Sequence, residues 1–459
     1  MKTAGKNDFS AGSVPRTILK MAGPITLAEI VNVLYNIVDR MYIGRMPGDG
    51  AMALAGLGIC LPFTMVVSAF ARLCGEGGAP ICSIERGRGN LDRAARVQGN
   101  SFAMLVAAGL MITLLGSLLM KPVLLAFGAD GETLPYAAAY CRIYLLGSTA
   151  VMISLGMNHY INAQGYARIG MATVAIGAVI NIVLDPVLIY GLHMGVSGAA
   201  LASVIAQAVS AAWVLRFLTG KRAIVPLRTV AMKPDGELIR RILALGTAGF
   251  VVGLTNSAAQ AAANRVLGTI GGGIYISVQT IIASVREVIS MPIMGLSSGA
   301  KPVIGFNYGA RRFDRVRESI RFTTLAALAY NTCAWILVLL LPAQLMGIFT
   351  GDAALIETGI VPFRAYYACY VFMTFQTMGQ SCYSAMGFAK QSIFFSVFRK
   401  IVLVVPLMLI LPKAAALGAL GVFLAEPISE VIGGMFSYGT MYFTIYRNLG
   451  KKQLHGAAD

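Results

Sequence analysis

The chain has 459 residues and carries 37 basic against 20 acidic side chains, a net charge of +17. Apolar residues make up 57% of it and charged residues 12%, whereas a soluble domain has roughly 25% charged residues. This composition excludes a soluble enzyme, a disulfide scaffold, a disordered chain and a nucleic-acid-binding domain.

Twelve apolar segments follow one another along the chain, and each is long enough to cross a bilayer as a helix, which takes about 20 residues. They lack the alternation of a barrel wall, and only helices and closed barrels satisfy their backbone polar groups in lipid. We therefore predict an all-α polytopic membrane protein with twelve transmembrane helices. The expected spans are 17–43, 51–73, 99–120, 134–158, 171–190, 196–217, 243–268, 276–299, 322–341, 360–386, 391–411 and 416–446.

The first span carries a stripe of four polar side chains, Glu29, Asn32, Asn36 and Asp39. Their spacings of three, four and three residues place them on one face of a helix. A charge at the centre of a span costs about 2.5–3.5 kcal/mol on insertion scales, so the stripe must face protein or water. We expect a functional stripe; the alternative is a stripe that only forms hydrogen bonds to other helices.

The fifth span contains Asn181 and Asp185, four residues apart, and then Pro186. Proline cannot donate a backbone hydrogen bond, so it should kink the helix and free a carbonyl oxygen near residue 182. Ser203 of the sixth span adds a hydroxyl. Such oxygen ligands suit a hard cation or a proton relay, and two carboxylates in one site favour binding of a proton. Asp39, Asn181 and Asp185 are therefore candidate ligands for Na⁺ or H⁺, the alternative being a structural hydrogen-bonded pair.

Basic residues concentrate in every second connection between the spans. Together with the chain ends, which include Lys2, Lys6, Lys451 and Lys452, these connections hold 24 basic residues, and the other connections hold three. The positive-inside rule then predicts a multi-pass protein of the inner (plasma) membrane with both termini in the cytoplasm. The same distribution accounts for the net charge without a nucleic-acid partner.

The two halves of the chain resemble each other. Residues 80–93 read PICSIERGRGNLDR and residues 302–315 read PVIGFNYGARRFDR, which aligns four identical residues at an offset of 222. Each half holds six predicted spans, and because six is even the two repeats run in the same direction through the membrane. We predict an N-terminal lobe at 1–218, a cytoplasmic linker at 219–241 and a C-terminal lobe at 242–459. A duplicated twelve-span chain is typical of a transporter that works by alternating access.

The second half does not repeat the carboxylates of the first, since Asp39 aligns with Ala263 and Asp185 with Leu407. Coupling chemistry should therefore lie in the N-terminal lobe alone. The second half has charges of its own within predicted spans, and Glu426 either forms a structural ion pair with Arg399 or Lys400 or faces the substrate. The polar residues expected to line a substrate cavity are Glu29, Asn32, Asn36, Asn256, Gln279, Glu287, Arg399 and Glu426.

Several motifs point to one family. The first span reads LYNIVDRMYIGRM, and the eighth continues into PVIGFNYGARRFDRVR. QGYAR follows in the first half at 164–168, and AEPISE in the second half at 425–430. In these motifs the chain resembles the multidrug and toxic compound extrusion (MATE) family of cation-coupled efflux transporters. The seventh span, TAGFVVGLTNSAAQAAANRVLG, has no carboxylate, which places the chain nearer the DinF-like and MepA-like branches of the family.

The resemblance implies two pseudo-symmetric six-helix lobes that form a V-shaped cleft. It also implies antiport, in which a cytosolic compound, often an organic cation, leaves as Na⁺ or H⁺ enters. The family's ion site in the N-terminal lobe corresponds to Asp39, Asn181, Asp185 and Ser203, joined by a tyrosine of the fourth span, either Tyr140 or Tyr144.

The main alternative is a flippase of lipid-linked precursors, for which the cations of the second half would provide a positive cleft; a passive channel is a further one. The chain has no H-E-x-x-H motif, and we expect neither an enzyme nor a cofactor. We expect a monomer in the lipid bilayer whose partners are small drugs or toxic compounds. The sequence does not select between H⁺ and Na⁺ as the coupling ion.

Overall fold

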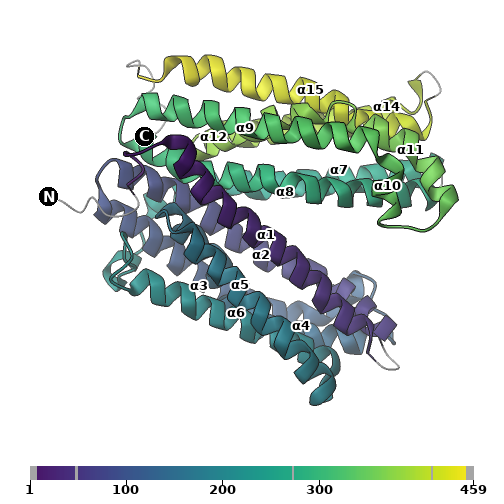
Figure 1. Ribbon diagram of the computed structural model, residues 1–459. Helices are drawn as coiled ribbons and strands as arrows, with labels where there is room; N and C mark the ends of the chain where they lie inside the picture. Colours follow the sequence, from purple (N-terminus) through teal and green to yellow (C-terminus); the bar gives the residue numbers. More distant parts are fainter. Residues whose placement is uncertain (1–7, 47–49, 271–272, 415–416, 451–459) are drawn as a thin grey trace. The chain divides into compact units, whose positions relative to one another are not determined.

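The computed structural model describes residues 8–46, 50–270, 273–414 and 417–450, and Lys2, Lys6, Lys451 and Lys452 lie outside these ranges. Every regular element in the described ranges is a helix (Figure 1), which confirms the all-α class. The first half contains α1 (Val14–Gly44), α2 (Gly50–Gly87), α3 (Leu91–Ala126), α4 (Leu134–Ala163), α5 (Ala167–Pro186), η1 (Val187–Gly191), α6 (Gly195–Thr219) and η2 (Thr229–Met232). The second contains α7 (Gly236–Ile270), α8 (Gly273–Gly309), α9 (Phe313–Leu340), α10 (Pro342–Gly347), α11 (Ala353–Tyr367), η3 (Tyr370–Phe372), α12 (Met373–Ala385), α13 (Ala389–Val397), η4 (Phe398–Val404), α14 (Val405–Ile410), α15 (Ala419–Thr444) and η6 (Tyr446–Asn448).

Within the described residues, 11 helices are long and apolar enough to cross a membrane. They correspond to all of the predicted spans except the tenth. The tenth, 360–386, is not a single helix as predicted, because the chain leaves the α-helical path at residues 368–372 between α11 and α12. Its two helical pieces of 15 and 13 residues are each shorter than a bilayer crossing needs.

The break is stabilised by side chains of the neighbouring helix α9. Asn331 Nδ2 donates to the carbonyl oxygens of Tyr370 and Val371 at 3.0 and 3.4 Å, and Trp335 Nε1 donates to that of Tyr367 at 2.8 Å. Backbone groups inside a membrane must find partners within the protein. Asn331 and Trp335 therefore donate the hydrogen bonds that these carbonyl oxygens would accept from backbone N–H groups in a continuous helix.

The chain divides into two compact units, and the division does not follow the two sequence halves at the N-terminus. Residues 23–246 belong to the first unit, whereas residues 9–22 join residues 247–459 in the second. Asn307 Nδ2 donates to the carbonyl of Phe9 at 3.1 Å, and Arg315 Nη1 donates to that of Gly12 at 2.9 Å. The Phe9 ring packs edge-on against Phe306. These contacts hold the start of the described chain on the α8–α9 junction.

In the first unit α4 is the central helix, and it packs against α2, α3, α5 and α6. Small residues allow this close approach, as is usual for helices in lipid. A Cβ at Gly156 would lie 3.0 Å from the backbone oxygen of Ala71, and at Gly147 it would collide with the side chain of Val204. The packing of α5 on α6 in the same unit brings together the polar residues described below.

The stretch 219–241, which we expected to act as a linker, packs on the first unit. Gln98 and Gln164 both donate to the carbonyl of Val225 at 3.2 Å, and Val225 N donates back to Gln164 at 2.9 Å. Further along, Arg96 forms an ion pair with Asp235 at 2.7 Å. The stretch is thus anchored at both ends, and α7 already begins at Gly236.

In the second unit α15 packs against α11, α12, α14 and η4. The core of the second unit is rich in aromatic rings from α11 and from the break between α11 and α12. Tyr366, Tyr367 and Tyr370 lie with neighbouring ring centroids 5.2 Å apart. This core surrounds a group of buried charges.

Candidate functional site

The first unit contains a buried polar cluster between α5 and α6. Asn181 Nδ2 donates to Asp185 Oδ1 at 3.3 Å and to Ser203 Oγ at 3.2 Å. The carboxyl group of Asp39, on α1, interacts directly with that of Asp185. The structure thus brings together four side chains that the sequence singled out on three separate helices, and Asp39, Asn181 and Asp185 are all buried.

Four oxygen atoms of this region are buried without a hydrogen-bond partner among the described residues. They are Asp39 Oδ1, Asn181 Oδ1, Asp185 Oδ2 and Gln207 Oε1. Buried polar atoms are normally satisfied, so unpartnered acceptors indicate a missing donor or cation. An all-oxygen set with two carboxylates suits Na⁺ or a proton.

The helical turn that follows Asp185 carries a tyrosine that is hydrogen-bonded to α1. α5 ends at Pro186, and the chain continues as one turn of π-helix, η1. π-Helical turns often mark functional sites. From this turn Tyr190 Oη donates to the backbone oxygen of Tyr42 at 2.5 Å, one turn beyond Asp39 on α1. The predicted disturbance at Pro186 therefore positions the Asp39 and Asp185 carboxyl groups against each other.

Of the two tyrosines of α4, Tyr140 lies within electrostatic range of Asp39. Tyr144 lies behind it, stacked on Tyr140 with ring centroids 5.9 Å apart. Tyr140 is thus the better placed of the two to act with Asp39.

Two further residues, which the sequence pattern did not indicate, also border this cluster. Tyr35 interacts with both Asp39 and Asp185 and forms a side-chain hydrogen bond with Gln207. Tyr35 precedes Asp39 by four residues, and Gln207 follows Ser203 by four. The spacing of four residues places each on the same helical face as the site residue beside it.

Of the rest of the polar stripe on α1, Asn36 forms a side-chain hydrogen bond with Tyr35, which borders the cluster. Glu29 and Asn36 are exposed, Asn32 is half-buried, and Asn36 Nδ2 donates to the backbone oxygen of Asn32 at 2.6 Å. Glu29 is near Arg72 and Glu76 of α2. In the second unit Asn256 and Glu287 are exposed and Gln279 is buried, and none of these three is bonded to either buried cluster within the described ranges.

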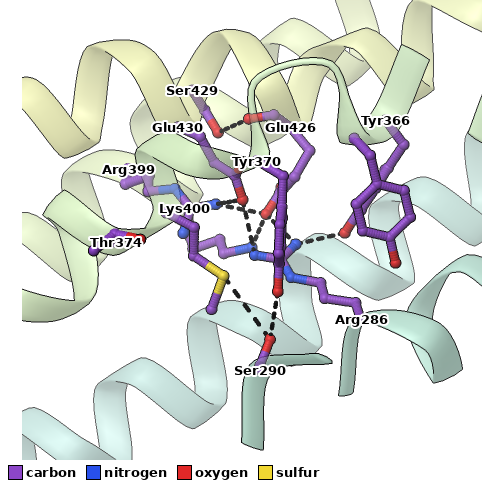
Figure 2. A network of polar contacts seen from close by, with 12 residues as sticks. Arg286, Ser290, Tyr366, Tyr370, Thr374, Arg399, Lys400, Glu426, Ser429 and Glu430 are labelled. Carbon is purple, nitrogen blue, oxygen red and sulfur yellow. Dashed lines mark hydrogen bonds and ion pairs between the residues drawn. The ribbon is translucent and has the colours of Figure 1, made fainter. Parts of the chain in front are cut away.

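The second unit holds a network of buried charges, shown in Figure 2, that joins α8, η4 and α15. Three cations converge on Glu426 Oε1: Arg286 Nη1 at 2.5 Å, Arg399 Nη2 at 2.6 Å and Lys400 Nζ at 2.8 Å. Glu430, one helical turn on, accepts from Arg286 at 3.1 Å and Arg399 at 3.4 Å. Arg399 and Glu426, which the sequence placed in a substrate cavity, are thus members of an ion-pair network.

The neighbouring aromatic core orients this network (Figure 2). Arg286 Nη1 donates to Tyr366 Oη at 2.5 Å, and its guanidinium carbon lies 5.6 Å from the Tyr366 ring centroid. The hydroxyls of Tyr370 and Ser290 are 2.8 Å apart. Arg399 and Lys400 belong to the π-helix η4, whose wider turn lets two consecutive side chains reach the same carboxylate.

Comparison with known proteins identifies relatives of this chain by sequence and by fold. Residues 24–187 and 250–410 match the MatE family model. Multidrug export protein MepA of Staphylococcus haemolyticus (strain JCSC1435) is 24% identical over 348 residues, 76% of this chain and 76% of that protein. MepA of Staphylococcus aureus (strain N315) is 23% identical over 349 residues, again 76% of each. A crystal structure of MATE in the bent conformation has a TM-score of 0.91 at 24% identity and covers 97% of this chain and 99% of that one, which shows a shared fold.

Proposed function

Because this chain belongs to the MatE family of membrane transporters, we propose that it exports small drug-like compounds from the cytoplasm in exchange for an inward H⁺ or Na⁺. Its relatives from Staphylococcus are multidrug export proteins, which supports this substrate class and does not favour a lipid flippase. The uneven distribution of basic residues supports a plasma-membrane orientation with both termini in the cytoplasm.

The observation that carries the proposal is the buried cluster of unpartnered oxygens in the first unit. Asp39 Oδ1, Asp185 Oδ2 and Asn181 Oδ1 lack donors among the described residues. Two adjacent carboxyl groups are costly in a membrane interior while both are charged. A bound H⁺ or Na⁺ removes this cost, so occupancy of the site is linked to the arrangement of α1 and α5.

In the proposed cycle the outward-open protein takes up the cation at Asp39 and Asp185. Neutralisation of the pair changes how α1 packs against α5, and α1 bends near Pro24, which lacks one helical hydrogen bond. Pro24 lies just after the point where α1 passes from the second unit to the first. Substrate is released outward, the protein turns inward, and the cation leaves to the cytoplasm.

Coupling requires that cation and substrate shift one conformational equilibrium in opposite directions. An inward charge moving through 100 mV supplies about 2.3 kcal/mol. That energy sustains a gradient of about fifty-fold for one neutral substrate per charge. A single coupling ion is therefore sufficient for effective export.

The test uses purified protein in liposomes loaded with ethidium, under an imposed H⁺ or Na⁺ gradient. We expect gradient-driven dye movement in the wild type and its loss in Asp39→Asn and Asp185→Asn. Asp314→Asn, at a fully exposed side chain of α9, is the matched control and should transport normally. Normal gradient-driven transport by Asp39→Asn would overturn the proposed site.

A further inference from the structure

The charge network of the second unit contains more positive than negative groups. Arg286, Arg399 and Lys400 contribute three cations, and Glu426 and Glu430 contribute two carboxylates. Arginine does not lose its proton in proteins, so two of the cations are permanent. A net positive charge inside a membrane protein is costly unless a counter-charge is present.

Two of the three positive groups are more exposed than the two carboxylates, and the third, Arg399, is buried with them. The side chains of Arg286 and Lys400 are 17% and 11% exposed, whereas those of Glu426 and Glu430 are 3% and 1% exposed. A charged group in a membrane protein faces the protein interior or water rather than lipid, so a solute that reaches the network meets Arg286 and Lys400 first.

The network also has hydrogen-bond donors to spare. Arg399 Nε is buried without a partner among the described residues, and Lys400, which has three donor hydrogens, donates one described bond, to Glu426. Glu430 Oε2 has no donor either, and a proton bound there would increase the positive excess. The arrangement offers charge and hydrogen bonds to an acceptor that carries a single negative charge.

From this geometry we infer that the network of Arg286, Arg399 and Lys400 is a binding site for one monovalent anionic group. The ligand is a carboxylate, carried by an exported zwitterionic compound, or a free small anion such as chloride. Both supply one negative charge and a hydrogen-bond acceptor, which match the positive excess and the unused donors of the network. Binding itself does not depend on the proposed export function; only the choice of the carboxylate as part of the substrate rests on it.

The binding test uses the purified full-length protein in nanodiscs with radiolabelled benzoate and chloride as separate probes. We expect one saturable site per chain. Lys400→Met balances the network at two cations and two carboxylates and should weaken binding by about tenfold or more, because one unit of nearby charge is lost. Glu430→Gln removes a carboxylate and should tighten binding. Lys413→Met, at an exposed lysine of the same half, is the matched control.

A purely structural ion network would not respond with opposite signs to Lys400→Met and Glu430→Gln. If Glu430→Gln does not fold, Lys400→Arg replaces it and must retain binding, since it keeps the charge. Absence of saturable binding of both probes to the wild type would overturn the inference, as would equal binding by the wild type and Lys400→Met.

Transport then distinguishes the two sources of the anion. Rhodamine 110 carries a free carboxylate, and rhodamine 123 is its methyl ester. If the substrate provides the carboxylate, Lys400→Met loses export of rhodamine 110 and retains that of rhodamine 123. If the anion is free, wild-type export of rhodamine 123 depends on chloride and that dependence is lost in Lys400→Met. Export that shows neither pattern, with binding intact, would overturn a role in transport, and failure of all dye transport would bear on the export function and not on the binding site.

Discussion

Glu426→Gln should strongly destabilise the second unit, because it removes the carboxylate on which three buried cations converge. The contacts at Glu426 Oε1 measure 2.5, 2.6 and 2.8 Å to Arg286, Arg399 and Lys400. Removing one partner of a buried ion pair costs about 3–5 kcal/mol, since it leaves an uncompensated charge. We expect a loss of this size in the free energy of unfolding, which is a large share of the roughly 5–15 kcal/mol typical of folded proteins.

The assay is unfolding of the purified variant in mixed detergent micelles, followed by circular dichroism. Glu357→Gln, at an exposed glutamate of α11, is the control and should unfold like the wild type. Adding Lys400→Met to Glu426→Gln should recover part of the loss, because one unpaired cation is removed, and the double-mutant cycle measures the coupling directly. If Glu426→Gln were as stable as the control, the network would not hold this unit together.

Substitutions elsewhere in the chain test other features of the structure. Gly246→Ala places a Cβ against a backbone carbonyl of α2 and should lower the unfolding free energy by about 1–3 kcal/mol, whereas Gly253→Ala, with nothing within 4 Å, should not lower it. Asn331→Leu leaves carbonyls at the α11–α12 break without donors and should cost about 1–3 kcal/mol in the same unfolding assay; wild-type stability would show that the break needs no such donor. Tyr140→Phe should slow gradient-driven dye export about tenfold or more while Tyr144→Phe changes it little, and equal effects would contradict the preference for Tyr140.

Much of the first-unit cluster could be predicted from sequence because polar residues in a membrane helix are costly and therefore informative. Asn181 and Asp185 share a helical face by their spacing, and the structure shows them hydrogen-bonded. Tyr35 gives no such signal, because a tyrosine is common in apolar helices. Gln207 has the spacing from Ser203 that places it on the same face, but its role becomes visible only when its unpartnered oxygen is seen.

The break in the tenth span could not be predicted from local sequence. Residues 368–372 contain neither proline nor glycine, and the donors that stabilise the break belong to Asn331 and Trp335 on another helix. The full set of partners of Glu426 in the charge network could not be predicted from local sequence either. The sequence predicts that Glu426 pairs with Arg399 or Lys400. In the structure the π-helical turn of η4 lets both residues reach Glu426, and Arg286 of α8 is a third partner.

Coupling of an ion to substrate movement through Asp39 and Asp185 is tested most directly by running the transport cycle in reverse. Liposomes with no ion gradient receive a steep ethidium gradient, and entry or exit of H⁺ and of radioactive Na⁺ is followed as the dye moves. We expect one of these ions to move against the direction of the dye in the wild type and in Asp314→Asn, and not in Asp39→Asn or Asp185→Asn. Dye movement without countermovement of either ion in the wild type, or unchanged ion movement in both site variants, would contradict the account.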